Sequence, residues 1–160
     1  MKFLKQLDNF LRKLSTIKFI IIITIATFII SAIFGSIVQI LNIENSQTQL
    51  SISKAPYIVE LVAVGIIAPL LETLVFQHGI IKLLRKKPKN NDLAIIFISA
   101  LLFGLAHCYN VLYVIHTTLI GVLLAYSYIV YEDKKLHPFW VVVIIHSLRN
   151  SIVFVISHLF

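Results

Sequence analysis

The chain has 160 residues, of which 59% are hydrophobic and 13% are charged, and its mean hydropathy is +0.94. A soluble domain of this length needs a polar shell, and so few charged residues cannot form one. The composition therefore predicts an integral membrane protein with one membrane domain. The net charge of +7 does not indicate a nucleic-acid partner, because the basic residues gather at the ends of apolar segments.

Residues 1–17 predict an amphipathic helix on the cytoplasmic membrane surface. Apolar residues such as Phe3, Leu7 and Leu11 recur near helical spacing, with basic residues between them. A signal peptide is the competing interpretation, since a basic start precedes an apolar run. That run is too long for a signal core, so we assign it to a first transmembrane helix.

Residues 18–160 predict the membrane domain, which contains five apolar runs. The runs cover residues 19–41, 56–81, 93–107, 111–131 and 138–160. A helix needs about 20 residues to cross the bilayer, so four runs are long enough and the third, at about 15, is marginal. The predicted fold is an all-α polytopic bundle of about five transmembrane helices plus the N-terminal amphipathic helix.

Basic residues predict the orientation of these helices in the cell membrane. Twelve of the fourteen Lys and Arg residues lie near the N-terminus, in the 82–91 loop or in the 132–137 loop. The positive-inside rule places all three segments in the cytoplasm and the C-terminus outside. The 42–55 loop and the Cys108–Asn110 turn then also lie outside. Cys108 is the single cysteine, which excludes an intrachain disulfide, and we interpret it as a small apolar filler.

Four polar residues interrupt the apolar runs, namely Glu72, His107, His146 and Asn150. An ionisable side chain in hydrocarbon costs several kcal/mol, so its default interpretation is a functional site. A carboxylate and imidazoles can activate water, and an amide can bind an oxyanion. The set therefore predicts a hydrolase whose site lies within the membrane.

Helix geometry tests whether these residues can meet. At 1.5 Å per residue, Glu72 lies about 15 Å below the cytoplasmic boundary, His146 about 12 Å and Asn150 about 18 Å. These three depths agree, and His146 and Asn150 share a helix face. His107 is the exception at about 22 Å, unless its helix is tilted or begins in the cytoplasm.

Three stretches carry a resemblance to a known family. They are Ala68-Pro69-Leu70-Leu71-Glu72-Thr73-Leu74-Val75-Phe76-Gln77, Phe103-Gly104-Leu105-Ala106-His107 and His146-Ser147-Leu148-Arg149-Asn150. They resemble the Glu-Glu followed by Phe-Arg, the Phe-x-x-x-His and the His-x-x-x-Asn motifs of the CAAX-protease and bacteriocin-processing family (CPBP, or Abi). This family includes the CAAX prenyl endopeptidases. The resemblance covers roughly residues 56–155.

The resemblance implies an intramembrane endopeptidase that cleaves a peptide or a membrane-associated protein. Glu72 would be the catalytic base that activates water, assisted by His107. His146 and Asn150 would complete the site, with Asn150 as the oxyanion donor.

Four further residues of the motifs are assigned supporting roles. Phe76 and Phe103 match the family pattern. Thr73 stands where the family has its second glutamate, and Gln77 stands where it has arginine. Both can still donate hydrogen bonds, but the local charge is lower, so the site is a variant one.

Members of the family are often labelled metalloproteases, and the residues leave two mechanisms open. Glu72, His107 and His146 can supply three ligands to zinc with one position free. The sequence lacks the His-Glu-x-x-His helix signature. A metal-free mechanism with Glu72 as base explains the same residues, and we favour it slightly.

Other interpretations remain open at this level. Glu72 can form a structural ion pair with Arg149, and His146 with Asn150 can act as interhelical hydrogen-bond partners. The altered first motif and the short chain suit a bacteriocin self-immunity protein that protects without cleavage. A transporter subunit with Glu72 as proton carrier is the weakest alternative, because the chain has no internal repeat.

Overall fold

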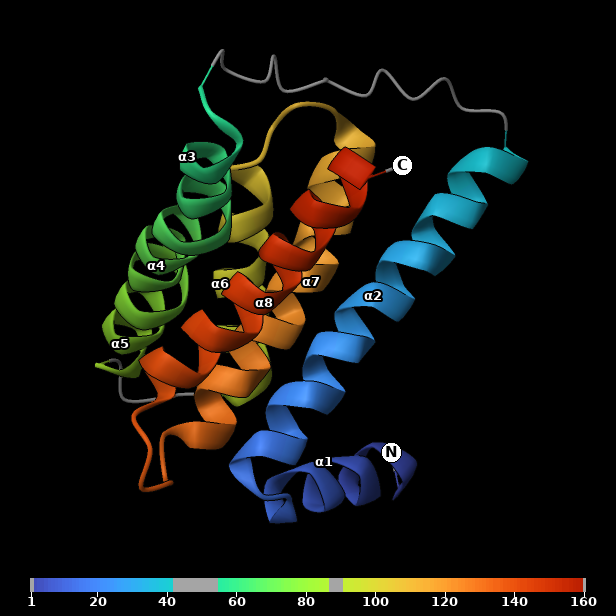
Figure 1. Ribbon diagram of the computed structural model, residues 1–160. Helices are drawn as coiled ribbons and strands as arrows, with labels where there is room; N and C mark the ends of the chain where they lie inside the picture. The colour runs from blue at the N-terminus through green and yellow to red at the C-terminus, as the bar shows by residue number, and fades with distance from the viewer. Residues whose placement is uncertain (1, 42–54, 87–90, 160) are drawn as a thin grey trace.

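The structure is a computed structural model that describes residues 2–41, 55–86 and 91–159. Every regular element in these ranges is a helix, and no strand occurs in them, which confirms the predicted all-α bundle (Figure 1). The elements in chain order are α1 (Lys2–Lys13), α2 (Thr16–Ile40), α3 (Tyr57–Val62), η1 (Ala63–Ile67), α4 (Ala68–Glu72), η2 (Thr73–Gly79), α5 (Ile80–Arg85), α6 (Asp92–Leu105), α7 (Val111–Tyr131) and α8 (Pro138–Leu159).

The N-terminal helix α1 lies across one end of the bundle (Figure 1). It ends at Lys13, earlier than the predicted boundary at residue 17, because the chain turns and α2 already begins at Thr16. Leu11 is buried, and the carboxylate of Asp8 accepts a hydrogen bond of 2.8 Å from the hydroxyl of Tyr126. These contacts attach the amphipathic helix to α7.

Four helices are long and apolar enough to cross a membrane, and they cover residues 16–40, 57–85, 111–131 and 138–159. The prediction of a spanning length is therefore right for four of the five runs. The third run forms α6, which has 14 residues and ends at Leu105. His107 consequently lies in the turn that follows α6 and not inside a helix.

The helix of residues 57–85 contains two π-helical segments, η1 and η2. A π-helix bonds each residue to the fifth one along instead of the fourth, so each turn takes more residues than in an α-helix. An ideal α-helix would place Gln77 about 140° round the helix axis from Glu72. That angle does not apply here, because η2 begins directly after Glu72 and contains Gln77.

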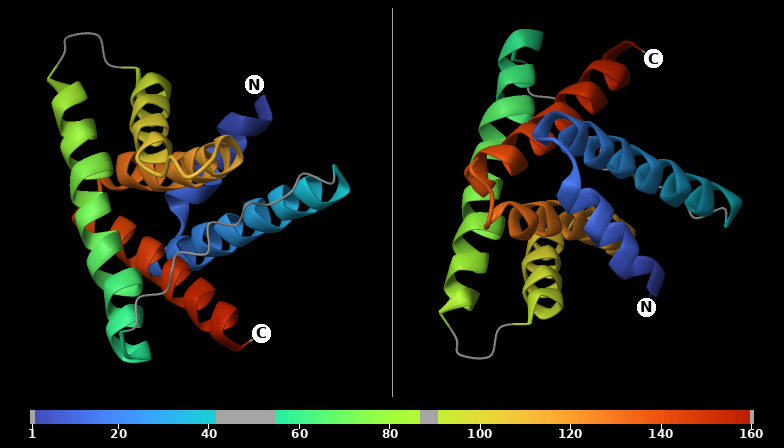
Figure 2. Two further views of the ribbon diagram at one scale, coloured as in Figure 1. Left: turned by 90° about the horizontal axis from the view of Figure 1, so that it is seen from above. Right: turned by 90° about the horizontal axis from the view of Figure 1, so that it is seen from below.

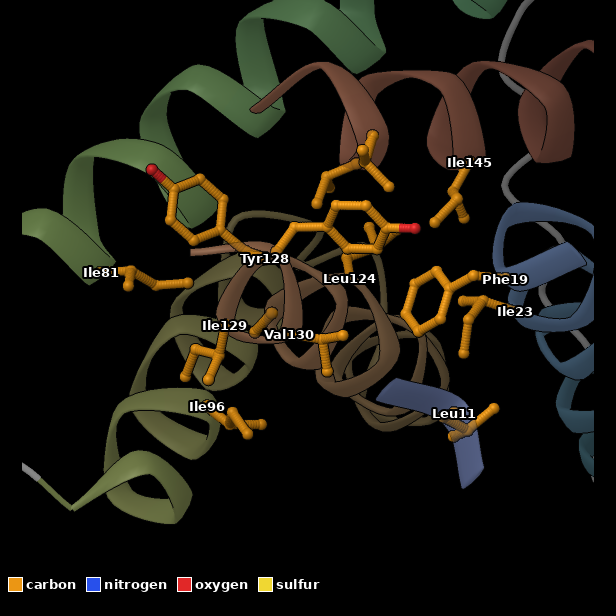
Figure 3. Close-up of a cluster of buried hydrophobic side chains, with 14 of the residues drawn as sticks. Leu11, Phe19, Ile23, Ile81, Ile96, Leu124, Tyr128, Ile129, Val130 and Ile145 are labelled. Atoms are coloured by element: carbon orange, nitrogen blue, oxygen red, sulfur yellow. The ribbon is translucent and has the colours of Figure 1, made fainter. Parts of the chain in front are cut away.

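Helix α7 lies at the centre of the packing, and residues from every other helix except α3, η1 and α4 reach its buried cluster (Figure 3). Leu124 and Tyr128 of α7 are fully buried there. Around them pack apolar side chains from the neighbouring helices, including Leu11, Phe19, Ile23, Ile81, Ile96 and Ile145. The cluster lies toward the end of the bundle that carries α1.

Small residues set the distance between α6 and α7. A Cβ on Gly104 would collide with the hydroxyl of Thr118 and lie 2.9 Å from the carbonyl oxygen of Val114. A Cβ on Gly121 would lie 3.0 Å from both the Cα of Ala100 and the ring of Phe103. Glycine at these two positions lets the two helix backbones approach closely, as small residues do in membrane bundles.

Helix α2 packs against the bundle, and its outer half still contacts α7, where the ring centroids of Phe34 and His116 lie 5.2 Å apart. Figure 2 shows α2 from two further sides. One face of α2 is apolar and exposed, with Ile21, Ile25, Ile29 and Ile33 each more than half accessible. A continuous apolar stripe of this kind is costly in water and suits contact with lipid.

The ends of the bundle match the predicted charge pattern. Helix α1, the end of α5 and the turn between α7 and α8 lie at one end, and the α6–α7 turn and the C-terminal end of α8 lie at the other (Figure 1). Arg85 at the end of α5 is paired there with Asp92 at 2.7 Å and with Glu132 at 2.6 Å. The predicted outer loop, 42–55, falls outside the described residues except for its last position.

Candidate active site

Three of the four predicted residues meet at one point in the bundle. Glu72 is the last residue of α4, His146 lies in α8, and His107 lies in the turn after α6. The Oε2 atom of Glu72 is 3.7 Å from Nε2 of His107 and 3.5 Å from Nε2 of His146. The depth mismatch expected for His107 therefore does not keep it from Glu72, because α6 is short and its following turn carries the imidazole to the carboxylate.

The backbone of α6 fixes the orientation of the His107 ring. Nδ1 of His107 is 2.7 Å from the carbonyl oxygen of Phe103. A carbonyl oxygen only accepts, so Nδ1 must carry the proton in this contact. A neutral His107 then presents the lone pair of Nε2 toward Glu72. Nε2 of His107 and the carboxylate of Glu72 are then both acceptors, so a water molecule between them could donate a hydrogen bond to each.

The chain neighbours Glu72 and Thr73 hold the two nitrogens of the His146 ring. Glu72 approaches Nε2, and the hydroxyl of Thr73 is 3.5 Å from Nδ1. Thr73 is fully buried and the His146 side chain is 3% exposed. The Glu72 and His107 side chains are 26% and 20% exposed, so the site is open on their side and closed behind His146.

Two aromatic residues of the motifs support the histidines. The ring of Phe103 is buried, with its centroid 4.6 Å from that of His107 and 5.6 Å from that of His146. Phe76 stacks edge-on against Phe103 at 5.7 Å. The aromatic pair thus forms an apolar support that leaves each imidazole little freedom to turn.

Asn150 does not contact Glu72 or either histidine within hydrogen-bond distance in the described part of the chain. Its Nδ2 donates to the carbonyl oxygen of Val64 at 3.3 Å, and its Oδ1 accepts from Nη1 of Arg149 at 3.1 Å. One N–H of the amide therefore has no partner among the described residues. It lies on the same face of α8 as His146, one turn away.

Gln77, which stands at the arginine position of the first motif, is an unusual buried polar residue. The side chain is fully buried, and neither its Nε2 nor its Oε1 has a hydrogen-bond partner among the described residues. The carbonyl oxygen of Phe76 lies in the same π-helical segment, and it accepts a hydrogen bond of 2.9 Å from the hydroxyl of Ser99 in α6. Sequence reasoning missed Ser99, because a serine in an apolar run carries no signal of its own.

The candidate zinc ligands do not assemble into a three-ligand site. Among residues 2–41, 55–86 and 91–159, no group of three or more His, Cys, Asp or Glu side chains has the geometry to hold a metal ion. Glu72, His107 and His146 meet only through one carboxylate oxygen.

Arg149 makes contacts that its sequence position did not indicate. A direct ion pair with Glu72 was one interpretation, but the two groups are not within salt-bridge distance, and Glu72 instead faces the histidines. Nη2 of Arg149 lies 3.5 Å from the hydroxyl of Ser31, which in turn lies 2.9 Å from Nε2 of His116. Ser31 and His116 lie outside the three motifs, and the sequence pattern does not single out either residue.

Comparison with known proteins identifies one similarity. A family model described as Rce1-like, type II CAAX prenyl endopeptidase, matches residues 54–152, which is more than half of the chain. No curated protein and no solved structure matches. The matched range contains Glu72, His107, His146 and Asn150, and it leaves out α1 and α2.

Proposed function

Because the chain belongs to the Rce1-like family of type II CAAX prenyl endopeptidases, we propose that it is an intramembrane endopeptidase in which Glu72 activates water. The family consists of multi-pass membrane proteases, in agreement with the four apolar helices of spanning length. The observation that carries the proposal is the approach of two imidazoles to one carboxylate oxygen, at 3.5 and 3.7 Å. The substrate is a peptide or a membrane-associated protein, and the enzyme itself lies in the lipid bilayer.

The first step is attack of water on the scissile carbonyl carbon. Glu72 takes one proton from the water, and the oxygen forms a bond to the carbon. His107 orients this water, since the lone pair of its Nε2 faces the same space as the carboxylate. The carbonyl oxygen becomes an oxyanion, which the free N–H of Asn150 stabilises.

The second step breaks the carbon–nitrogen bond. Protonated Glu72 returns its proton to the leaving nitrogen, and the electron pair of the oxyanion restores the carbonyl group. His146 keeps the carboxylate in place through its Nε2, and Thr73 holds the other side of that ring. Atoms and charge balance, because the proton that Glu72 accepts is the proton it gives back.

The direct experiment uses purified protein in lipid vesicles and a pair of fluorogenic CAAX peptides, one prenylated and one not, with and without chelator. Glu72→Gln should lower kcat at least about a hundredfold, as expected for loss of a general base. Glu60→Gln is the matched control, because Glu60 is another glutamate of the same long helix, is more buried than Glu72, and lies 3.9 Å from another histidine, His158. Its cleavage rate should equal that of the unaltered protein.

The same variants separate proteolysis from non-proteolytic bacteriocin self-immunity. The feature that favours this second function is the amide of Gln77, which is uncharged and has no hydrogen-bond partner among the described residues. Protection that requires cleavage disappears in Glu72→Gln, whereas protection by binding alone survives. Equal cleavage by the Glu72→Gln and unaltered proteins would refute the assignment of Glu72 as the base.

A further inference from the structure

A chain of hydrogen bonds runs from His116 of α7 through Ser31 of α2 to Arg149 and Asn150 of α8. Ser31 and His116 lie outside the three sequence motifs. The hydroxyl of Ser31 donates to the carbonyl oxygen of Thr27 at 3.0 Å. Its single proton is then used, so its oxygen must accept from Nε2 of His116 at 2.9 Å and from Nη2 of Arg149 at 3.5 Å. Donors and acceptors are consistent at every link.

The guanidinium of Arg149 connects Ser31 to Asn150 at the candidate active site. Its Nη1 donates to Oδ1 of Asn150 at 3.1 Å. A guanidinium has only donors, so this contact fixes which end of the Asn150 amide is oxygen. The NH₂ group must then point the other way, where Nδ2 donates to the carbonyl oxygen of Val64.

Charge adds to this geometric effect. Hydrogen bonds from a charged donor are stronger than neutral ones, and bonds in series polarise one another. A cation that pulls on Oδ1 makes the amide N–H groups better donors. The Nε of Arg149 is also buried without a partner among the described residues, and the side chain has no carboxylate within salt-bridge distance there. The charge is therefore available to Asn150 rather than neutralised.

We propose that Arg149 is the positioning residue of Asn150, and that Ser31 of α2 and His116 of α7 hold it in place. This inference rests on the proposed function for its catalytic meaning. It also assigns α2, which lies outside the range matched by the family model, a part in the active site.

Arg149→Met and Arg149→Lys test the proposal by steady-state cleavage of the prenylated CAAX peptide over a range of peptide concentrations. Arg149→Met should lower kcat about tenfold to a hundredfold with little change in KM, because part of the oxyanion stabilisation is lost. Arg149→Lys keeps a charge and a donor and should recover part of the rate. Ser31→Ala should lower kcat a few-fold. Ser36→Ala is the matched control, since Ser36 also bonds a carbonyl of α2, at 2.9 Å, but is exposed and outside the network.

A double-mutant cycle separates positioning from a general structural effect. If Arg149 acts through Asn150, then Arg149→Met has no further effect on kcat in an Asn150→Ala background. An undiminished effect in that background would overturn the proposal. So would equal rates for Ser31→Ala and Ser36→Ala combined with a normal rate for Arg149→Met.

A measurement that needs no activity distinguishes failure of this proposal from failure of the proposed function. In protein labelled with ¹⁵N-asparagine, the Asn150 side-chain signals are identified by their loss in Asn150→Ala. They should shift in Arg149→Met and Ser31→Ala but not in Ser36→Ala. If the unaltered protein cleaves neither peptide, the proposed function fails, and these shifts alone decide the positioning role. Unmoved signals in Arg149→Met overturn it.

Discussion

The Nε2 atom of His107 lies 3.7 Å from Oε2 of Glu72, while Nδ1 of the same ring donates a hydrogen bond to the backbone. The carbonyl oxygen of Phe103, four residues earlier, accepts this hydrogen bond. The ring therefore cannot turn to offer Nδ1 to the carboxylate without losing a hydrogen bond. The backbone carbonyl selects the Nδ1–H tautomer for a neutral His107, and the Nε2 lone pair then faces the space in front of Glu72.

A second histidine in the chain has nearly the same surroundings and provides a matched comparison. Nδ1 of His158 is 2.8 Å from the carbonyl oxygen of Phe154, and its Nε2 is 3.9 Å from Glu60. We expect His107→Gln to lower kcat about a hundredfold, since it removes the group that orients the water. His158→Gln should leave kcat unchanged. Cleavage assays on both variants check this, and equal losses would show that the His107 effect is structural.

The sequence was sufficient to predict the helices and most of the residues that meet. Long apolar runs predict membrane helices reliably, because every backbone polar group must be satisfied within the segment. The depth argument placed Glu72 and His146 at one level, and the two residues do meet. For His107 the same argument was misleading, since it assumed a helix that continues past Leu105.

Two features of the site leave no mark in the sequence pattern. A π-helical segment has the same apolar composition as an α-helix, so nothing signalled that η2 would rotate Gln77 relative to Glu72. The direction of Arg149 depends on how α2 packs against α8. That packing places Ser31 beside Arg149, and no spacing within either helix encodes it.

The close approach of α6 and α7 gives a stability prediction. Gly104→Ala and Gly121→Ala should each destabilise the protein by about 1–3 kcal/mol, because the added methyl overpacks the interface between the two helices. Gly35→Ala is the control, since a Cβ there has nothing within 4 Å, and it should be neutral or slightly stabilising. Thermal unfolding in detergent measures all three. A Gly104→Ala protein as stable as Gly35→Ala would show that the two helices are farther apart than described.

The orientation of the bundle in the membrane can be measured with the native cysteine. Cys108 is exposed in the α6–α7 turn, at the end of the bundle opposite α1. The positive-inside rule puts this turn outside the cell. A membrane-impermeant maleimide should therefore label Cys108 in intact cells. In Cys108→Ser carrying Asp133→Cys, in the turn between α7 and α8, labelling should require permeabilised cells. The reverse pattern would place the basic clusters outside.

The buried amide of Gln77 predicts an unusual response to mutation. Its two polar atoms are buried without partners among the described residues, which costs about 1–3 kcal/mol for an unsatisfied group. Gln77→Met keeps the approximate shape and removes that cost, so the thermal midpoint should rise.

Ser99→Ala is the contrasting variant for this prediction, because Ser99 is equally buried but its hydroxyl bonds the carbonyl oxygen of Phe76 in the same π-helical segment. Its loss leaves that carbonyl without the bond, so the thermal midpoint should fall. Both variants are compared with the unaltered protein by thermal unfolding in the same detergent. A lower midpoint for Gln77→Met would mean that the amide is satisfied by a bound water or ligand, and that residue 77 contributes its hydrogen bonds to the folded protein after all.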